Sequence, residues 1–218
     1  MRIYLTPVTE ADGPMIVKWR NSPQVSKHCF NRNPLSIESN KAFFKAHVET
    51  GHYMQYIVNR NEEDYGVASY PIATVYLKDI DKTNRRCELC IFTSSDEEWN
   101  TESQTLAIKQ LLKIAFRELN MHKVYSFVFS VFKDEYELLE KAGFHKEATL
   151  EKEALSPEGE YWDAYRMAIF VDDYMKLFGK ELEEEDAQTS AAEQKAEILA
   201  ALENSGKSAE EVLKFLKS

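Results

Sequence analysis

The stretch from residue 86 to residue 144 constrains the fold most, because it combines two strand patterns with a long amphipathic helix. Apolar residues of this helix recur at intervals of three and four positions and so form one stripe: Ile108, Leu111, Leu112, Ala115, Phe116 and Leu119. Residues 88–93 have the pattern of a short strand, and residues 124–131 are apolar enough for a strand buried on both faces. We therefore predict an α/β domain in which the first turn of the helix points at a cleft, where a helix N-terminus can hold an anion.

The composition limits the class of protein. With 218 residues, of which 44% are hydrophobic and 12% aromatic, the chain can bury one substantial core and a small appendage. It contains no apolar run near the ~18 residues of a membrane span and no signal-peptide stretch at its N-terminus, so we expect a cytoplasmic protein without a membrane partner. The formal net charge of -10 argues against nucleic acid as a partner, because phosphate binding favours a basic face.

Two of the three cysteines form a C-x-x-C pattern, which is compatible with a zinc site or a redox pair. No second cysteine pair and no histidine cluster accompanies Cys87 and Cys90. On a strand, positions three apart face opposite sides, so the two thiols would diverge. We interpret them as small buried side chains and expect no metal site.

Five motifs within residues 1–175 belong together. They are Trp19-Arg20-Asn21, Arg86-Cys87-Glu88-Leu89, Trp99, Lys141-Ala142-Gly143-Phe144, and Gly159-Glu160-Tyr161-Trp162-Asp163 followed by Met167. In this order they resemble the GCN5-related N-acetyltransferases (GNAT), within the branch of ribosomal-protein N-terminal, spermidine and nucleotide-sugar amine acetyltransferases. The resemblance implies an α/β (α+β) fold with a mixed, mostly antiparallel twisted sheet flanked by helices.

The resemblance also implies an activity, which is transfer of an acetyl group from acetyl-CoA to a primary amine. The acceptor would be a small molecule such as a polyamine or an amino sugar, or a protein or peptide N-terminus. Several chemistry-bearing positions differ from the family pattern while the fold motifs remain. A catalytically silent relative that binds a ligand, or an assembly module, is therefore the alternative.

Glu88 is the leading candidate for catalysis. An amine must lose a proton before it attacks a thioester, and a carboxylate in a sheet cleft can accept that proton directly or through water. The alternative is a structural carboxylate bonded to neighbouring strands or to Arg85 or Arg86. At the position where the family often has a tyrosine that acts as general acid, this chain has Leu139. Tyr136, one helical turn earlier, is therefore the second catalytic candidate, and a role in packing is the alternative.

The acetyl-CoA turn departs from the family pattern of (Gln or Arg)-x-x-Gly-x-(Gly or Ala). Glu102 and Gln104 replace the two small residues, and residues 101–104 fit a capping box whose side chains would compete with a phosphate for the helix N–H donors. The turn still offers the positive end of a helix dipole. The cofactor-binding candidates implied by the resemblance are Ile91, Phe92, Thr93, Asn100, Thr101, Ser103, Gln104 and Thr105.

The acceptor side is expected in an irregular loop between Pro23 and Pro34. In the resembling family this region covers the acceptor substrate. The substrate candidates are Phe30, Asn31 and Arg32, with His28 beside them. An ordinary surface loop is the alternative.

The composition changes near Gly179. We predict a GNAT-like domain at residues 1–179, an acidic linker at residues 180–189 and a C-terminal helical hairpin at residues 190–218. Two capping boxes, Ser190 with Glu193 and Ser208 with Glu211, announce the two arms of the hairpin. Helices this short are marginal alone, so the hairpin is expected to dock on the domain or to form a homo-oligomer.

Overall fold

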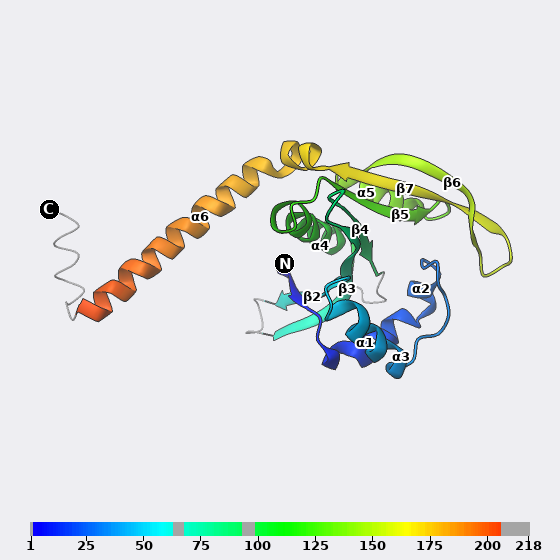
Figure 1. Ribbon diagram of the computed structural model, residues 1–218, viewed down its shortest axis with the longest axis horizontal. Helices are drawn as coiled ribbons and strands as arrows, with labels where there is room; N and C mark the ends of the chain where they lie inside the picture. The colour runs from blue at the N-terminus through cyan, green and yellow to red at the C-terminus, as the bar shows by residue number, and fades with distance from the viewer. Residues whose placement is uncertain (1, 63–67, 93–98, 206–218) are drawn as a thin grey trace. The chain divides into compact units, whose positions relative to one another are not determined.

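The structure is a computed structural model that describes residues 2–62, 68–92 and 99–205. Its chain contacts define two compact units, Met1–Asp173 and Tyr174–Ser218. The first unit contains one seven-stranded sheet with the strand order β1-β2-β3-β4-β5-β7-β6 (Figure 1). The strands are β1 (Arg2–Pro7), β2 (Met54–Glu62), β3 (Ala68–Asp81), β4 (Arg86–Ile91), β5 (Lys123–Phe129), β6 (His145–Leu155) and β7 (Tyr161–Phe170).

Helices flank this sheet. They are α1 (Gly13–Arg20), α2 (Pro23–Ser26), α3 (Ile37–Phe43), α4 (Thr101–Lys113) and α5 (Lys133–Lys141), with short turns η1 (Glu10–Asp12), η2 (Phe44–Val48) and η4 (Ile114–Glu118). In Figure 1, α1, α2 and α3 gather beside β2 and β3. All strand pairs are antiparallel except β4 with β5, which confirms the predicted mixed, mostly antiparallel sheet.

The predicted apolar stripe forms the core side of α4. Ile108, Leu111, Leu112 and Ala115 have no exposed surface, and the helix packs against β1, β3 and β4. Its last turn widens into the π-helical turn η4, and Met121 donates its N–H to the carbonyl of Ala115, which ends the helix before β5. Burial of this stripe fixes the helix that follows β4.

The pairing of β4 with β5 covers three residue pairs and ends at Glu88 opposite Tyr125. Beyond this point each strand keeps only its outer neighbour: Ile91 still faces Val75 of β3, and Phe129 still faces Ala164 of β7. The two strands therefore diverge, and a gap opens inside the sheet between residues 89–91 and residues 126–129.

Cys87 and Cys90 lie on opposite sides of β4, as predicted. Cys87 is fully buried, and burial raises the pKa of its thiol to about 12. Cys90 faces the gap between β4 and β5. Cys29, Cys87 and Cys90 are all free thiols. Within the described ranges, no group of three or more His, Cys, Asp or Glu side chains is arranged to hold a metal ion.

The C-terminal part differs from the sequence prediction. A single helix, α6, runs over Val171–Ser205, where we predicted the end of the domain, an acidic linker at residues 180–189 and the first arm of a hairpin. The prediction of a linker was wrong because residues 181–186 are helix-forming Glu and Leu with one Asp, and one Gly in a helix costs only about 1 kcal/mol. The second arm, residues 206–218, lies outside the described residues.

No helix among the described residues is long and apolar enough to cross a membrane.

Candidate functional site

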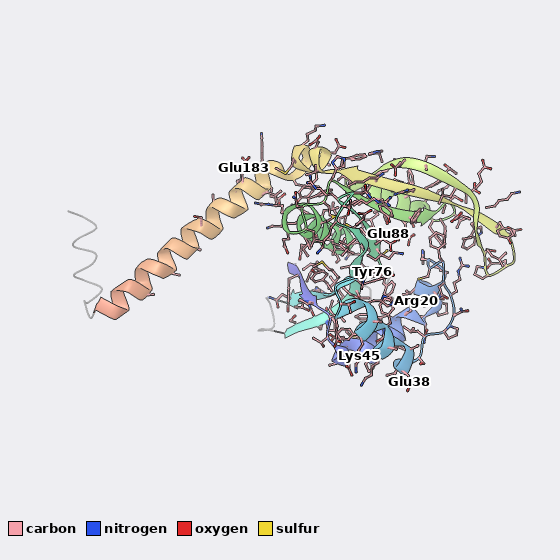
Figure 2. All side chains as sticks on the ribbon, in the orientation of Figure 1. Arg20, Glu38, Lys45, Tyr76, Glu88 and Glu183 are labelled. Atoms are coloured by element: carbon pink, nitrogen blue, oxygen red, sulfur yellow. The ribbon has the colours of Figure 1, made fainter. Side chains whose placement is uncertain are left out.

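The gap between β4 and β5 contains a cavity of about 270 Å³. Its walls are formed by β4, the end of β5, the turn after α2, one face of α5 and two residues of β3. Arg20 from α1, Tyr76 from β3 and Glu88 from β4 all line it, and Figure 2 shows these three side chains near one another. The predicted residues Glu88, Ile91 and Phe92 therefore come together with the loop after α2.

Glu88 is buried, with 6% of its surface exposed, and it has two close partners. Lys78 lies directly across the β3–β4 pair, and its Nζ is 3.0 Å from Oε1 of Glu88. The thiol of Cys90 donates a hydrogen bond to the same oxygen at 3.1 Å. Burial by itself lowers the pKa of Lys78, but the nearby Cys90 and Glu88 outweigh it and raise that pKa, so Lys78 is a cation at neutral pH.

The basic partner of the Glu88 carboxylate is Lys78. Neither Arg85 nor Arg86 has this role: Arg85 donates to the carbonyl and side chain of Asn120, and Arg86 pairs with Asp81 at 3.4 Å. Glu88 is thus a carboxylate whose charge is already matched by Lys78.

A second acid–base pair lines the same cavity. Nδ1 of His28 lies 2.6 Å from Oε1 of Glu135, which is in the first turn of α5. The His28 ring also packs on the Phe132 ring, with 4.0 Å between centroids. Nδ1 is buried, and the Glu135 carboxylate is its close polar neighbour among the described residues. Glu135 and Phe132 thereby position the imidazole at the wall of the cavity.

Two of the three predicted substrate residues line the cavity. Phe30 and Asn31 do so, and the half-exposed Phe30 ring lies edge-on to Phe129, with 4.8 Å between centroids. Arg32 does not line it. Its guanidinium lies over the rings of Phe129 and Trp162, and it donates to the carbonyl of Leu155. Arg32 therefore anchors the loop to the β6–β7 hairpin.

Tyr136 does not line the cavity. Its ring lies 5.6 Å from that of Tyr165, and a hydrogen bond with Glu140 raises its pKa. The helix turns Leu139 toward the cavity instead, and Leu139 is almost fully buried. Among the described residues, the tyrosine that lines the cavity is Tyr76. Burial raises the pKa of its hydroxyl well above the ordinary value.

The N-terminus of α4 has a different cap from the predicted one. The N-cap residue is Asn100, not Thr101, and its Oδ1 accepts from the N–H groups of Glu102 at 3.0 Å and Ser103 at 3.1 Å. Gln104 reaches back and donates to the carbonyl of Trp99 at 2.8 Å. The expectation that side chains occupy the helix N–H donors is therefore confirmed, with the cap one residue earlier.

The other cofactor candidates have mixed positions. Ser103 is fully buried, so its hydroxyl faces the protein interior. The Thr105 hydroxyl donates to the carbonyl of Thr101 at 2.7 Å. Thr93 lies outside the described residues. Ile91 and Phe92 line the cavity, and Asn100 and Thr101 are exposed at the start of α4.

The comparisons with known proteins agree with this architecture. Residues 2–145 match the acetyltransferase (GNAT) domain family, so the chain belongs to the GNAT acetyltransferases. A search of curated proteins found no significant match.

Solved structures with the same fold include spermidine N-acetyltransferase from Vibrio cholerae in complex with CoA and spermine. That structure is 23% identical, with a TM-score of 0.71 over 79% of this chain and 98% of that chain. A chimera of the same enzyme with hSSAT is 21% identical, with a TM-score of 0.70 over 80% of this chain and 99% of that chain. At this level of identity the likeness concerns the fold.

Proposed function

We propose that this protein transfers an acetyl group from acetyl-CoA to a primary amine in the cavity between β4 and β5. The observation that carries the proposal is the divergence of these two strands. Backbone N–H and C=O groups on the facing edges have no strand partner there, and an extended chain with amide groups can bond to them as an added strand would. The pantetheine arm of CoA is such a chain.

The residues present fit the arm of CoA better than its pyrophosphate. Residues 89–91 and 126–128 would hold the arm, and the N-terminus of α4 would receive the phosphates. At that turn Asn100 already occupies two N–H donors, and the exposed Glu102 adds a negative charge. We therefore expect binding of CoA to be weaker than at a glycine-rich turn.

Calorimetric titration of the full-length protein with CoA tests this assignment. We expect measurable binding below millimolar concentration. If neither the wild-type protein nor a variant with a freed turn binds CoA at millimolar concentration, the catalytically silent alternative replaces the acetyltransferase proposal.

We propose His28 as the group that takes the proton from the acceptor amine. A base held by a second acidic residue has the geometry of known acid–base pairs in acyl transfer, and Glu135 supplies that second residue. Glu88, the candidate from the sequence, faces the same cavity but is matched by Lys78. Its role in this proposal is to hold Lys78 and the Cys90 thiol in place.

We propose further that the C-terminal helix mediates self-association. The sequence of its last described turns carries Ile198, Leu199 and Leu202 at the spacing of one helix face, and a long helix gains most of its stability from packing.

Truncation after Phe178 is therefore expected to lower the number of subunits per particle, as calculated from the mass measured by light scattering. CoA titration of the truncated protein serves as the control for an intact first unit. An unchanged number of subunits would contradict self-association through α6.

A further inference from the structure

A second cavity of about 220 Å³ adjoins the first. The two share Arg20, Asn31, Tyr76 and Phe92, so a ligand can extend from one into the other. The second cavity lies between α1, α3, β2 and β3 and has amide and aromatic walls, namely Asn33, Asn40, Gln55, Phe43 and Tyr53. None of the described residues that line it carries a carboxylate.

Arg20 is the charged residue at the wall between the two cavities. Its Nη2 donates to the carbonyl of Asn31, which positions the guanidinium. Its Nη1 is buried and has no hydrogen-bond partner among the described residues. No described carboxylate lies within 4.0 Å of the group, whereas Lys78 is paired with Glu88 and His28 with Glu135.

A buried charged donor without a partner destabilises the protein, and a ligand that brings an opposite charge removes this penalty on binding. We propose that Arg20 binds an oxyanion of the acceptor substrate, a carboxylate or a phosphate, in the second cavity. This inference rests on the proposed function, because it places the amine of the same acceptor in the first cavity near His28. The aromatic walls formed by Phe43, Tyr53 and Phe92 suit the apolar body of such a molecule.

The charges in the two cavities disfavour a polyamine as the acceptor. A second ammonium group would need a free carboxylate, but Glu88 and Glu135 already have partners. In the second cavity it would meet the guanidinium of Arg20 instead, which has no carboxylate partner among the described residues. The acceptor class that fits is an amine with a negative group at its other end.

Calorimetric titration without CoA tests the site with matched amines. Phenylalanine, phenylalaninamide and phenethylamine differ in carrying a carboxylate, a neutral amide or neither, and glucosamine 6-phosphate against glucosamine tests phosphate as the source of the oxyanion. We expect the wild type to bind phenylalanine or glucosamine 6-phosphate about 10-fold more tightly than its counterpart without the oxyanion, which is the usual effect of one charge-assisted hydrogen bond. The pair that shows this preference identifies carboxylate or phosphate.

The variant Arg20→Gln is expected to lose the preference, and Arg20→Lys, which keeps the charge, to retain part of it. Arg60→Gln is the matched control, because Arg60 is a half-buried arginine of β2 that lines neither cavity. Melting curves of all three variants verify that they are folded.

Equal binding of amines with and without the oxyanion, tighter binding of spermidine, or no binding of phenylalanine or glucosamine 6-phosphate at millimolar concentration would overturn the proposal. Failure of the acetyltransferase assignment has a separate signature. In that case the anionic amines bind through Arg20, while the protein neither binds CoA nor acetylates them.

Discussion

Substitution of His28 by Gln is expected to lower kcat for amine acetylation by about 10²- to 10⁴-fold, the usual contribution of a general base. Glutamine keeps a polar group of similar size in the contact with Phe132 but cannot take up a proton. KM for the amine should change little, because the lost interaction acts in the transition state. Steady-state kinetics with a saturating supply of acetyl-CoA measures both parameters.

Three further variants assign the roles of the neighbouring residues. Glu135→Gln is expected to lower kcat less than His28→Gln, since it disturbs the orientation of the imidazole and leaves the base in place. Lys27→Gln is the control, because the Lys27 ammonium lies over the same Phe132 ring yet does not line the cavity. Glu88→Gln decides between the two bases: a loss of about 10²-fold in its kcat, with His28→Gln near wild type, would return the role to Glu88.

The double variant Asn100→Gly, Glu102→Gly is expected to bind CoA about 10²-fold more tightly than the wild type. Removal of an exposed charge about 5 Å from a pyrophosphate contributes roughly 1 kcal/mol, or about 5-fold. Release of the Glu102 and Ser103 N–H groups from the Asn100 side chain gives the phosphate two further donors, each worth about 1 kcal/mol. Glycine at an N-cap costs the helix only a few tenths of a kcal/mol, so the variant should remain folded.

Calorimetry at two salt concentrations separates the parts of this effect. The share that comes from Glu102 should shrink at high salt, because exposed charges are screened. Glu102→Gln removes the charge without adding backbone freedom and should reproduce only that share. Low micromolar binding in the wild type with no response to any of these variants would show that the pyrophosphate lies elsewhere.

Local patterns in the sequence were enough to predict the framework of the site. The stripe from Ile108 to Phe116 predicted the buried face of α4, and the spacing of Cys87 and Cys90 predicted that the two thiols lie on opposite sides of β4. These features depend on residues a few positions apart, where helix and strand periodicity apply directly. The family motifs added the mixed topology of the sheet.

The chemistry of the site depends on contacts that periodicity does not reveal. Lys78 meets Glu88 through the register of two strands, and His28 meets Glu135 only because a loop and a helix converge at the gap. The cap at Asn100 lies one residue before the predicted one, within the usual uncertainty of a helix boundary. In α6, the acidic run resembled a linker because its charge was more conspicuous than its helix propensity.

The short β4–β5 pairing gives the ligand a structural part in the domain. Three residue pairs join the antiparallel half formed by β1 to β4 with the half formed by β5, β7 and β6. A molecule bonded to both facing edges would bridge these halves where the protein itself does not. Because such a molecule binds only the folded chain, occupancy of the gap and resistance to unfolding are thermodynamically linked, and each substrate that fits the gap also stabilises the sheet.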